Sequence, residues 1–195
     1  MIFGIGLSKT ATKSLGKMME MLNYKVLNST GIINKLLDDN NRQSMGKLNY
    51  DVVIDGDQMF LYKEMSKAYP DAKFILTDRD FDEWLVSMVN HNLNKDRSVT
   101  KKDIERFITL YKNHKKDAQN FFGDKLLIMN LFTDENVWKK LCNFLGIDNN
   151  YQGYTIPHMN RAIKRHFNTI DQIENAYDME IKPEERGRGS IDKYD

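Results

Sequence analysis

Short apolar runs alternate along the chain with segments in which apolar residues recur at helical spacing. The apolar runs lie at residues 2–5, 24–27, 51–54, 73–77 and 125–129. Helical spacing follows the first run at Leu15, Met18, Met19 and Leu22, and the third at Met59, Tyr62, Met65 and Tyr69. Runs without regular polar alternation are typical of strands that are buried on both faces. The pattern therefore predicts a three-layer α/β/α fold with a central, mainly parallel five-stranded sheet.

A longer helical pattern occupies the middle of the chain. Residues 93–122 have the spacing of a helical insertion, and Thr100 with Asp103 predicts an N-cap within it. We expect this insertion to form a lid or a wall of the substrate pocket. It also carries the aromatic residues Phe107, Tyr111, Phe121 and Phe122, for which core packing and stacking on a substrate are both open.

The last fifty residues have a weaker pattern. They predict a loop at 148–157, a helix from about residue 158 to 177, and a polar tail at 184–195. We find no repeat and no linker, so residues 1–195 are predicted to form one domain.

The charges of the chain nearly balance. Lys and Arg number 29 and Asp and Glu 28 among 195 residues, which gives a formal net charge of +1. Such a chain has no general positive field for a polyanion, so we expect no nucleic-acid partner, and any anion site must be local. The single cysteine, Cys142, excludes an internal disulfide, and its apolar helical neighbours favour a buried thiol. The oligomeric state is left open.

Neither a metal site nor a membrane-spanning segment is expected. The histidines lack the spacing of metal ligands; they are His91, His114, His158 and His166. No apolar run approaches the length of a membrane span, and the chain enters a strand at once instead of showing a signal segment. We therefore expect a soluble, cytoplasmic protein with no membrane partner.

The first strand runs directly into a loop suited to an anion. Residues 3–15 read Phe-Gly-Ile-Gly-Leu-Ser-Lys-Thr-Ala-Thr-Lys-Ser-Leu and join this strand to a helix. Unpaired N–H groups at a helix N-terminus, the helix dipole and a lysine together attract phosphate or sulfate. We call residues 8–14 the anion loop.

The anion loop is not a Walker loop, which has Gly, four residues and then Gly-Lys-Ser/Thr. Here Ser8 precedes Lys9, and the position six residues before Lys9 is Phe3. A P-loop kinase remains an alternative, because Asp55 follows a predicted strand and has the carboxylate that would hold Mg²⁺.

The loop instead resembles the 5′-phosphosulfate loop of sulfotransferases, commonly Pro/Ser-Lys-Thr-Gly-Thr-Thr-Ser-Leu. Two positions depart from that pattern, since Ala11 replaces the usual glycine and Lys13 stands where a hydroxyl residue is common. A second element agrees with the family: a strand ends in Arg79, and Ser87 follows eight residues later, as in the sulfotransferase 3′-phosphate element. Segments 130–146 and 156–161 are also similar to one branch of this family, in the same order along the chain.

This resemblance implies a fold like that of P-loop NTPases and an enzyme that uses 3′-phosphoadenosine 5′-phosphosulfate (PAPS). The sulfuryl group would pass to a hydroxyl or amine of a small-molecule or glycan acceptor without a metal, and Lys9 would stabilise the leaving group. The family's nucleotide-binding positions correspond to Ser8, Lys9, Thr10, Ala11, Thr12, Lys13, Ser14, Arg79 and Ser87. A protein that binds the nucleotide without turnover remains a further alternative.

An acceptor hydroxyl needs a base. Asp55 is our first candidate, because it is expected at the carboxyl end of a buried strand on the edge of the sheet where the anion loop lies. Asp57 is the second, and either carboxylate suits an N-cap equally well. His91 is a rival base, since many sulfotransferases use a histidine. His158 is expected either to line the acceptor pocket or to be a packed or helix-capping histidine.

The polar tail offers one more basic element. Arg186 and Arg188 alternate with glycines, and some sulfotransferases close their nucleotide site with a late basic loop that contains glycine. We include both arginines as candidate nucleotide contacts, with a disordered tail as the alternative. The acceptor itself has no motif in the sequence.

Overall fold

Five parallel strands form the centre of the computed structural model, which describes residues 1–28, 49–56, 59–148, 150–151, 153–159 and 165–176. The strands are β1 (Ile2–Gly4), β2 (Val26–Asn28), β3 (Val52–Ile54), β4 (Lys73–Asp78) and β5 (Leu126–Asn130). Their order across the sheet is β2-β3-β1-β4-β5, and every neighbouring pair is parallel. Each strand lies within two residues of an apolar run, so the predicted α/β/α fold is confirmed.

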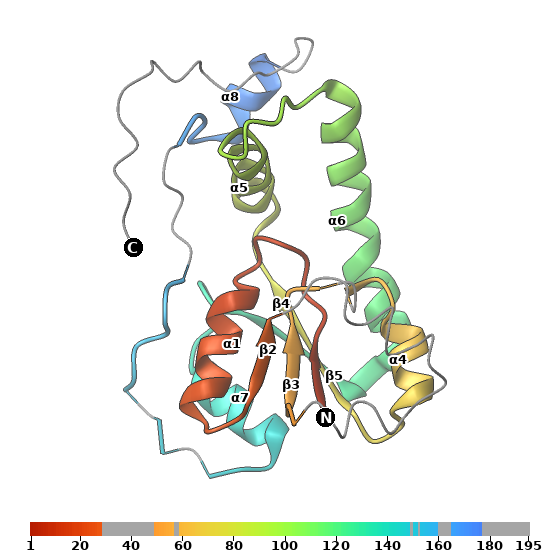
Figure 1. The fold of residues 1–195 in the computed structure, drawn as a ribbon. Helices are drawn as coiled ribbons and strands as arrows, with labels where there is room; N and C mark the ends of the chain where they lie inside the picture. Colours follow the sequence, from red (N-terminus) through yellow and green to blue (C-terminus); the bar gives the residue numbers. More distant parts are fainter. Residues whose placement is uncertain (29–48, 57–58, 149, 152, 160–164, 177–195) are drawn as a thin grey trace.

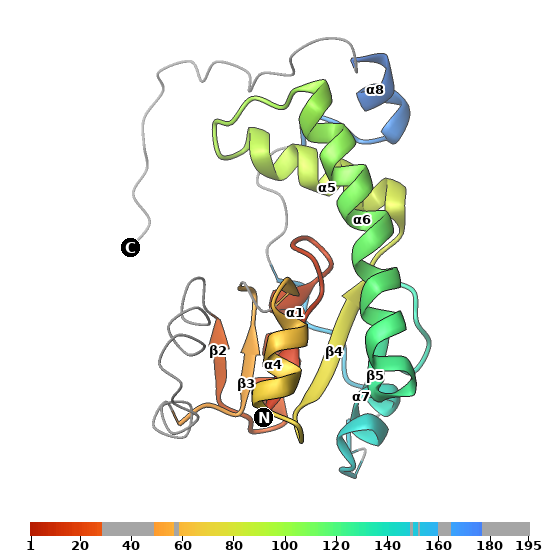
Figure 2. The same ribbon diagram turned by 90° about the vertical axis from the view of Figure 1, so that its right-hand side faces the viewer.

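Helices cover both faces of the sheet (Figures 1 and 2). They are α1 (Thr12–Met21), α4 (Tyr62–Ala68), α5 (Phe81–Leu93), α6 (Lys101–Phe122), α7 (Val137–Leu145) and α8 (Ile170–Asn175), with a short 3₁₀ turn η2 (Gly123–Lys125). Helices α1 and α7 lie on one face, and α4 with the C-terminal half of α6 on the other. Helices α5 and α8 lie beyond the carboxyl ends of the strands, beside the N-terminal half of α6.

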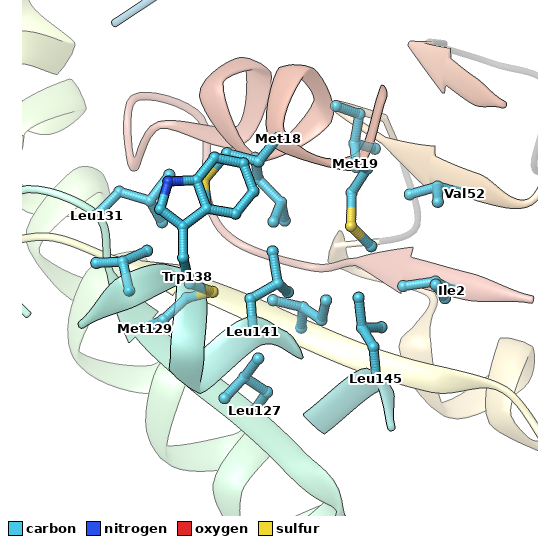
Figure 3. Close-up of a cluster of buried hydrophobic side chains, with 14 residues drawn as sticks. Ile2, Met18, Met19, Val52, Leu127, Met129, Leu131, Trp138, Leu141 and Leu145 are labelled. Carbon is cyan, nitrogen blue, oxygen red and sulfur yellow. The ribbon is translucent and has the colours of Figure 1, made fainter. Parts of the chain in front are cut away.

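Three apolar clusters hold these layers together. The largest lies between the sheet and helices α1 and α7, where Met18, Leu141 and Trp138 meet the strands (Figure 3). A second joins the opposite face of the sheet to α4 and α6, and a third joins α5, α6 and α8. Cys142 is fully buried in α7, as predicted. Burial on both faces explains why the strand sequences lack polar alternation.

The long middle helix starts where its cap was predicted. Thr100 Oγ1 accepts a hydrogen bond from Asp103 N at 3.2 Å, and Asp103 Oδ2 accepts one from Thr100 N at 3.1 Å, a capping box that precedes Lys101. The helix predicted from about residue 158 to 177 is confirmed only in its C-terminal part, where α8 lies. Residues 158–159 and 165–169 are not helical, and α8 begins only at Ile170.

Close packing brings the segment just before the anion loop against the end of β4. A Cβ added to Gly6 would clash with the Thr77 hydroxyl and lie 2.7 Å from the Thr77 carbonyl oxygen. Only glycine permits this approach, so the chain leaves β1 directly beside the carboxyl end of β4. The anion loop and the residues after β4 therefore share one edge of the sheet.

Candidate anion-binding site

A cavity of about 280 Å³ opens at the carboxyl ends of the strands. Its walls come from the anion loop, the residues after β3, β4 and β5, helix α5 and the segment before residue 160. The lining residues are Ser8, Lys9, Ala11, Thr12, Lys13, Ser14, Asp55, Gly56, Met59, Arg79, Ser87, His91, Lys95, Phe132, His158 and Met159. The topology thus brings residues that are far apart in the sequence around one space.

Free backbone N–H groups face this region from the start of α1. Ala11 is the N-cap, with φ 70°, and within the described chain no acceptor is recorded for the N–H groups of Ala11, Thr12, Lys13 and Ser14. Unpaired N–H groups and the helix dipole favour an anion at this position. The first turn of α1 has no acidic side chain, so nothing within that turn competes for the site.

The hydroxyl groups of the anion loop have different surroundings. Thr10 does not line the cavity: its side chain points inward, donates to Leu7 O at 2.7 Å and lies 2.7 Å from Thr77 Oγ1. Thr12 Oγ1 donates to Asp55 Oδ1 at 3.2 Å. Ser14 Oγ accepts from Met159 N at 3.2 Å, which leaves its own proton for another acceptor.

Positive charge predominates around the cavity. Among the described residues, Lys9, Lys13, Arg79 and Lys95 line it with one carboxylate, that of Asp55. Burial lowers the pKa of Lys9, and the nearby charges of Arg79 and Lys13 lower it further. A chain with a net charge of +1 has therefore gathered cations in one place, which is the local anion site that its balanced composition required.

Arg79 connects the two sides of the cavity. Its Nη1 donates to Lys9 O at 3.3 Å, its Nε donates to Glu83 Oε2 at 3.2 Å, and its guanidinium lies 4.7 Å from the centre of the Phe132 ring. A guanidinium has five N–H donors, and these two bonds leave three without a partner among the described residues. Ser87 lies two turns along α5 and lines the same cavity, so the spacing between Arg79 and Ser87 brings both side chains to one space.

The candidate bases reach the cavity from different elements. Asp55 follows β3 with φ 59°, accepts the bond from Thr12 and lies 4.0 Å from Lys13 Nζ. His91 lies on α5, where burial, and then the charges of Lys9 and Lys95, lower its pKa to about 4. His91 is therefore neutral at pH 7.

The remaining candidate positions have different outcomes. Asp57, Arg186 and Arg188 are outside the described residues. His158 lines the cavity and meets the Phe132 ring edge-on at 5.8 Å.

Four residues that line the cavity were not predicted as site residues from the sequence: Met59, Lys95, Phe132 and Met159. A signal existed only for Lys95, because Ser87, His91 and Lys95 are spaced four residues apart and so share one side of a helix.

Helix α6 takes part in the packing around the cavity. None of its described residues lines the cavity, whereas Lys95, between α5 and α6, does. Phe107 lies edge-on to Trp84 at 6.5 Å, and the Tyr111 hydroxyl donates to Arg79 O at 2.6 Å. Phe122 stacks on Phe74 of β4 at 4.4 Å. These aromatic side chains contribute to the clusters that support the site.

No three His, Cys, Asp or Glu side chains in the described part of the chain are arranged to hold a metal ion. Among the same residues, no helix has the length and apolar character needed to cross a membrane. A family model described as a sulfotransferase domain matches residues 1–107, a span that contains Lys9, Asp55, Arg79 and Ser87. A search of curated proteins found no match.

Proposed function

Since the chain belongs to the sulfotransferase family, whose model covers more than half of it, we propose that it transfers a sulfuryl group from PAPS to a hydroxyl or amine of a small-molecule or glycan acceptor. The observation that carries this proposal is the convergence of Lys9, Arg79 and Ser87 on one cavity. The anion loop and the end of β4 resemble the family's two phosphate-binding elements, and both line this one cavity.

The donor groups of the cavity fit a doubly phosphorylated nucleotide. In the described part of the chain, four cationic side chains and one carboxylate line the cavity, and the N–H groups at the start of α1 that have no acceptor there add further donors. We assign the 5′ end of the nucleotide to the anion loop and its 3′-phosphate to Arg79 and Ser87. Among the loop hydroxyls, Ser14 retains a proton to donate, whereas the Thr10 hydroxyl donates to Leu7 O.

Lys9 is the proposed stabiliser of the leaving group. When bound, PAPS supplies a sulfuryl group on a phosphate that leaves through a bridging oxygen. The Lys9 ammonium would donate to that oxygen and offset the negative charge that develops there. The lowered pKa of Lys9 makes its ammonium a stronger acid, which suits this role.

Asp55 is the proposed base for the acceptor. Its carboxylate lines the cavity, and the Thr12 hydroxyl and the Lys13 ammonium hold it in place. We expect Asp55→Asn to lower kcat about 100-fold while leaving the affinity for adenosine 3′,5′-bisphosphate nearly unchanged. If His91→Gln produces that pattern and Asp55→Asn does not, His91 is the base instead.

A binding experiment tests the nucleotide assignment. Adenosine 3′,5′-bisphosphate at 100 times its Kd should stabilise the protein by about 2.7 kcal/mol, which raises Tm by roughly 5–10 °C without Mg²⁺. A P-loop kinase would respond to ATP with Mg²⁺ instead. The absence of any response to the bisphosphate would contradict the proposed function.

Sulfate transfer from labelled PAPS to a mixed panel of acceptors tests catalysis. Lys9→Ala should abolish measurable transfer, whereas Lys17→Ala should not. Lys17 is the matched control because it lies on the exposed side of α1, where it pairs with Glu20 at 2.9 Å. If the protein binds the bisphosphate but transfers sulfate to no acceptor, it is a nucleotide-binding protein without turnover.

A further inference from the structure

Two consecutive carbonyl groups of the anion loop are held from outside the loop. Trp84 Nε1 on α5 donates to Ser8 O at 2.9 Å, and Arg79 Nη1 donates to Lys9 O at 3.3 Å. The residues around them are also fixed, since His114 Nε2 lies 2.7 Å from Ile5 O and Thr10 donates to Leu7 O. Each of these carbonyl oxygens thus has a partner.

The orientation of a carbonyl determines the orientation of the adjoining N–H. In a trans peptide the C=O and N–H bonds point in opposite directions, so the bond from Trp84 to Ser8 O also fixes the N–H of Lys9. No acceptor for that N–H is recorded within the described chain. The peptide between Ser8 and Lys9 therefore directs its N–H away from Trp84, and both residues line the cavity.

Lys9 needs such support because its backbone is strained. Its φ of 74° lies in the left-handed region, which costs a residue with a Cβ about 1–2 kcal/mol. A conformation of this kind persists only where the surroundings enforce it. The bonds to Ser8 O and Lys9 O act on the two peptides that flank the Lys9 Cα, so they are placed to enforce it.

Trp84 is well suited to hold a fixed position. Its side chain is fully buried in the cluster of α5, α6 and α8, where its ring lies 5.0 Å from Tyr111 and 6.5 Å from Phe107. Tyr111 also donates to Arg79 O at 2.6 Å. Both donors to the anion loop are therefore supported by the same cluster.

We propose that Trp84 is a positioning residue for the anion loop: its indole N–H orients the peptide between Ser8 and Lys9 so that Lys9 meets the 5′ end of the nucleotide. This inference rests on the proposed function, which assigns the 5′ end to the loop. It adds that the loop depends on one buried hydrogen bond from α5 for its geometry.

The chain contains its own matched control. Trp138 on α7 is also buried, and its Nε1 donates to the Tyr154 carbonyl at 3.0 Å, which does not line the cavity. We expect Trp84→Phe to weaken binding of adenosine 3′,5′-bisphosphate about three- to tenfold, the range for the loss of one hydrogen bond. Trp138→Phe should stay within about twofold of the wild type.

A second ligand separates positioning from a general loss of structure. Adenosine 3′-monophosphate lacks the 5′-phosphate, so Trp84→Phe should leave its affinity within about twofold of the wild type in calorimetric or NMR titrations. Equal weakening for both ligands, or equal effects of Trp84→Phe and Trp138→Phe, would overturn the inference. If the wild type itself does not bind the bisphosphate, the proposed function fails first.

A variant with an unchanged ring shape covers the case in which Trp84→Phe does not fold. In a Trp138→Phe background, Trp84 is the only tryptophan and can be replaced by its benzothiophene analogue, in which sulfur takes the place of the N–H. This analogue preserves the packing but cannot donate to Ser8 O. The analogue should again lower the affinity for the bisphosphate and leave the affinity for the monophosphate nearly unchanged. An unchanged affinity for the bisphosphate would contradict the role of Trp84.

Discussion

Single residues of the anion loop carry backbone strain that the sequence only hints at. Ala11 has φ 70°, a value that favours glycine, and glycine is what the family usually has at this position. The resemblance identified Ala11 as a departure from the family, and the positive φ explains why glycine is usual there, because glycine adopts this conformation without strain. The inward turn of the Thr10 hydroxyl had no such signal, because residue type alone does not say which way a loop side chain points.

Ala11→Gly should stabilise the protein. Relief of the left-handed strain is worth about 1–2 kcal/mol, and the added freedom of the unfolded chain offsets roughly half of it. We expect a gain of about 0.5–1 kcal/mol in the free energy of unfolding, measured with urea. Ala118→Gly is the control, because Ala118 is buried inside α6 and its replacement should destabilise by about 1 kcal/mol. A loss of stability in Ala11→Gly would contradict the strain argument.

His91 should make the folded protein less stable in acid. Its folded pKa of about 4 is below the ordinary value of 6.5, so between these values the unfolded chain binds more protons than the folded one. Stability is therefore lost as the pH falls from about 6.5 toward 4. An NMR titration should give His91 a midpoint near 4, and His91→Gln should flatten the loss of unfolding free energy between pH 7 and pH 5. A midpoint near 6.5 would refute this prediction.

At the scale of elements, strands and helix starts followed from local patterns, whereas contacts between elements did not. The five apolar runs and the Thr100 cap depend on neighbours in the sequence, so they could be predicted. Lys95 and Phe132 reach the cavity only because α5 lies beyond the edge of the sheet at which β5 ends. The helix that was wrongly predicted near residue 158 rested on a weak sequence pattern. His158 and Met159 instead form part of the cavity wall.

The end of α7 depends on a lysine from another element. Lys73, at the start of β4, donates through Nζ to Phe144 O at 2.6 Å and Leu145 O at 3.0 Å. A cation at a helix C-terminus satisfies free carbonyls and complements the helix dipole. Lys73→Met should lower the free energy of unfolding by about 1–2 kcal/mol in urea titrations. Lys25→Met is the control, since the exposed Lys25 Nζ donates to Asn49 and to no other residue that the structure describes, and its effect should stay below about 0.5 kcal/mol.

For the whole molecule, the segment that the family model matches is shorter than the part of the chain that forms the sheet and its helices. The family model ends at residue 107, but β5 pairs with β4 and α7 covers one face of the sheet through Trp138 and Leu141. A chain of residues 1–107 would expose that face and leave α6 incomplete. We expect no cooperative thermal unfolding of this fragment by circular dichroism, whereas the full chain should unfold cooperatively. A cooperative transition in the fragment would show that it folds alone.

The bond from Arg79 to the carbonyl of Lys9 has a consequence for affinity. Under the proposed assignment, a 3′-phosphate that immobilises the Arg79 guanidinium would also immobilise the backbone that faces the 5′ end, and by thermodynamic linkage the 5′ end would favour binding of the 3′ end equally. The two ends of the nucleotide would then share one ordering cost, and the whole nucleotide should bind more tightly than the affinities of its separate halves imply.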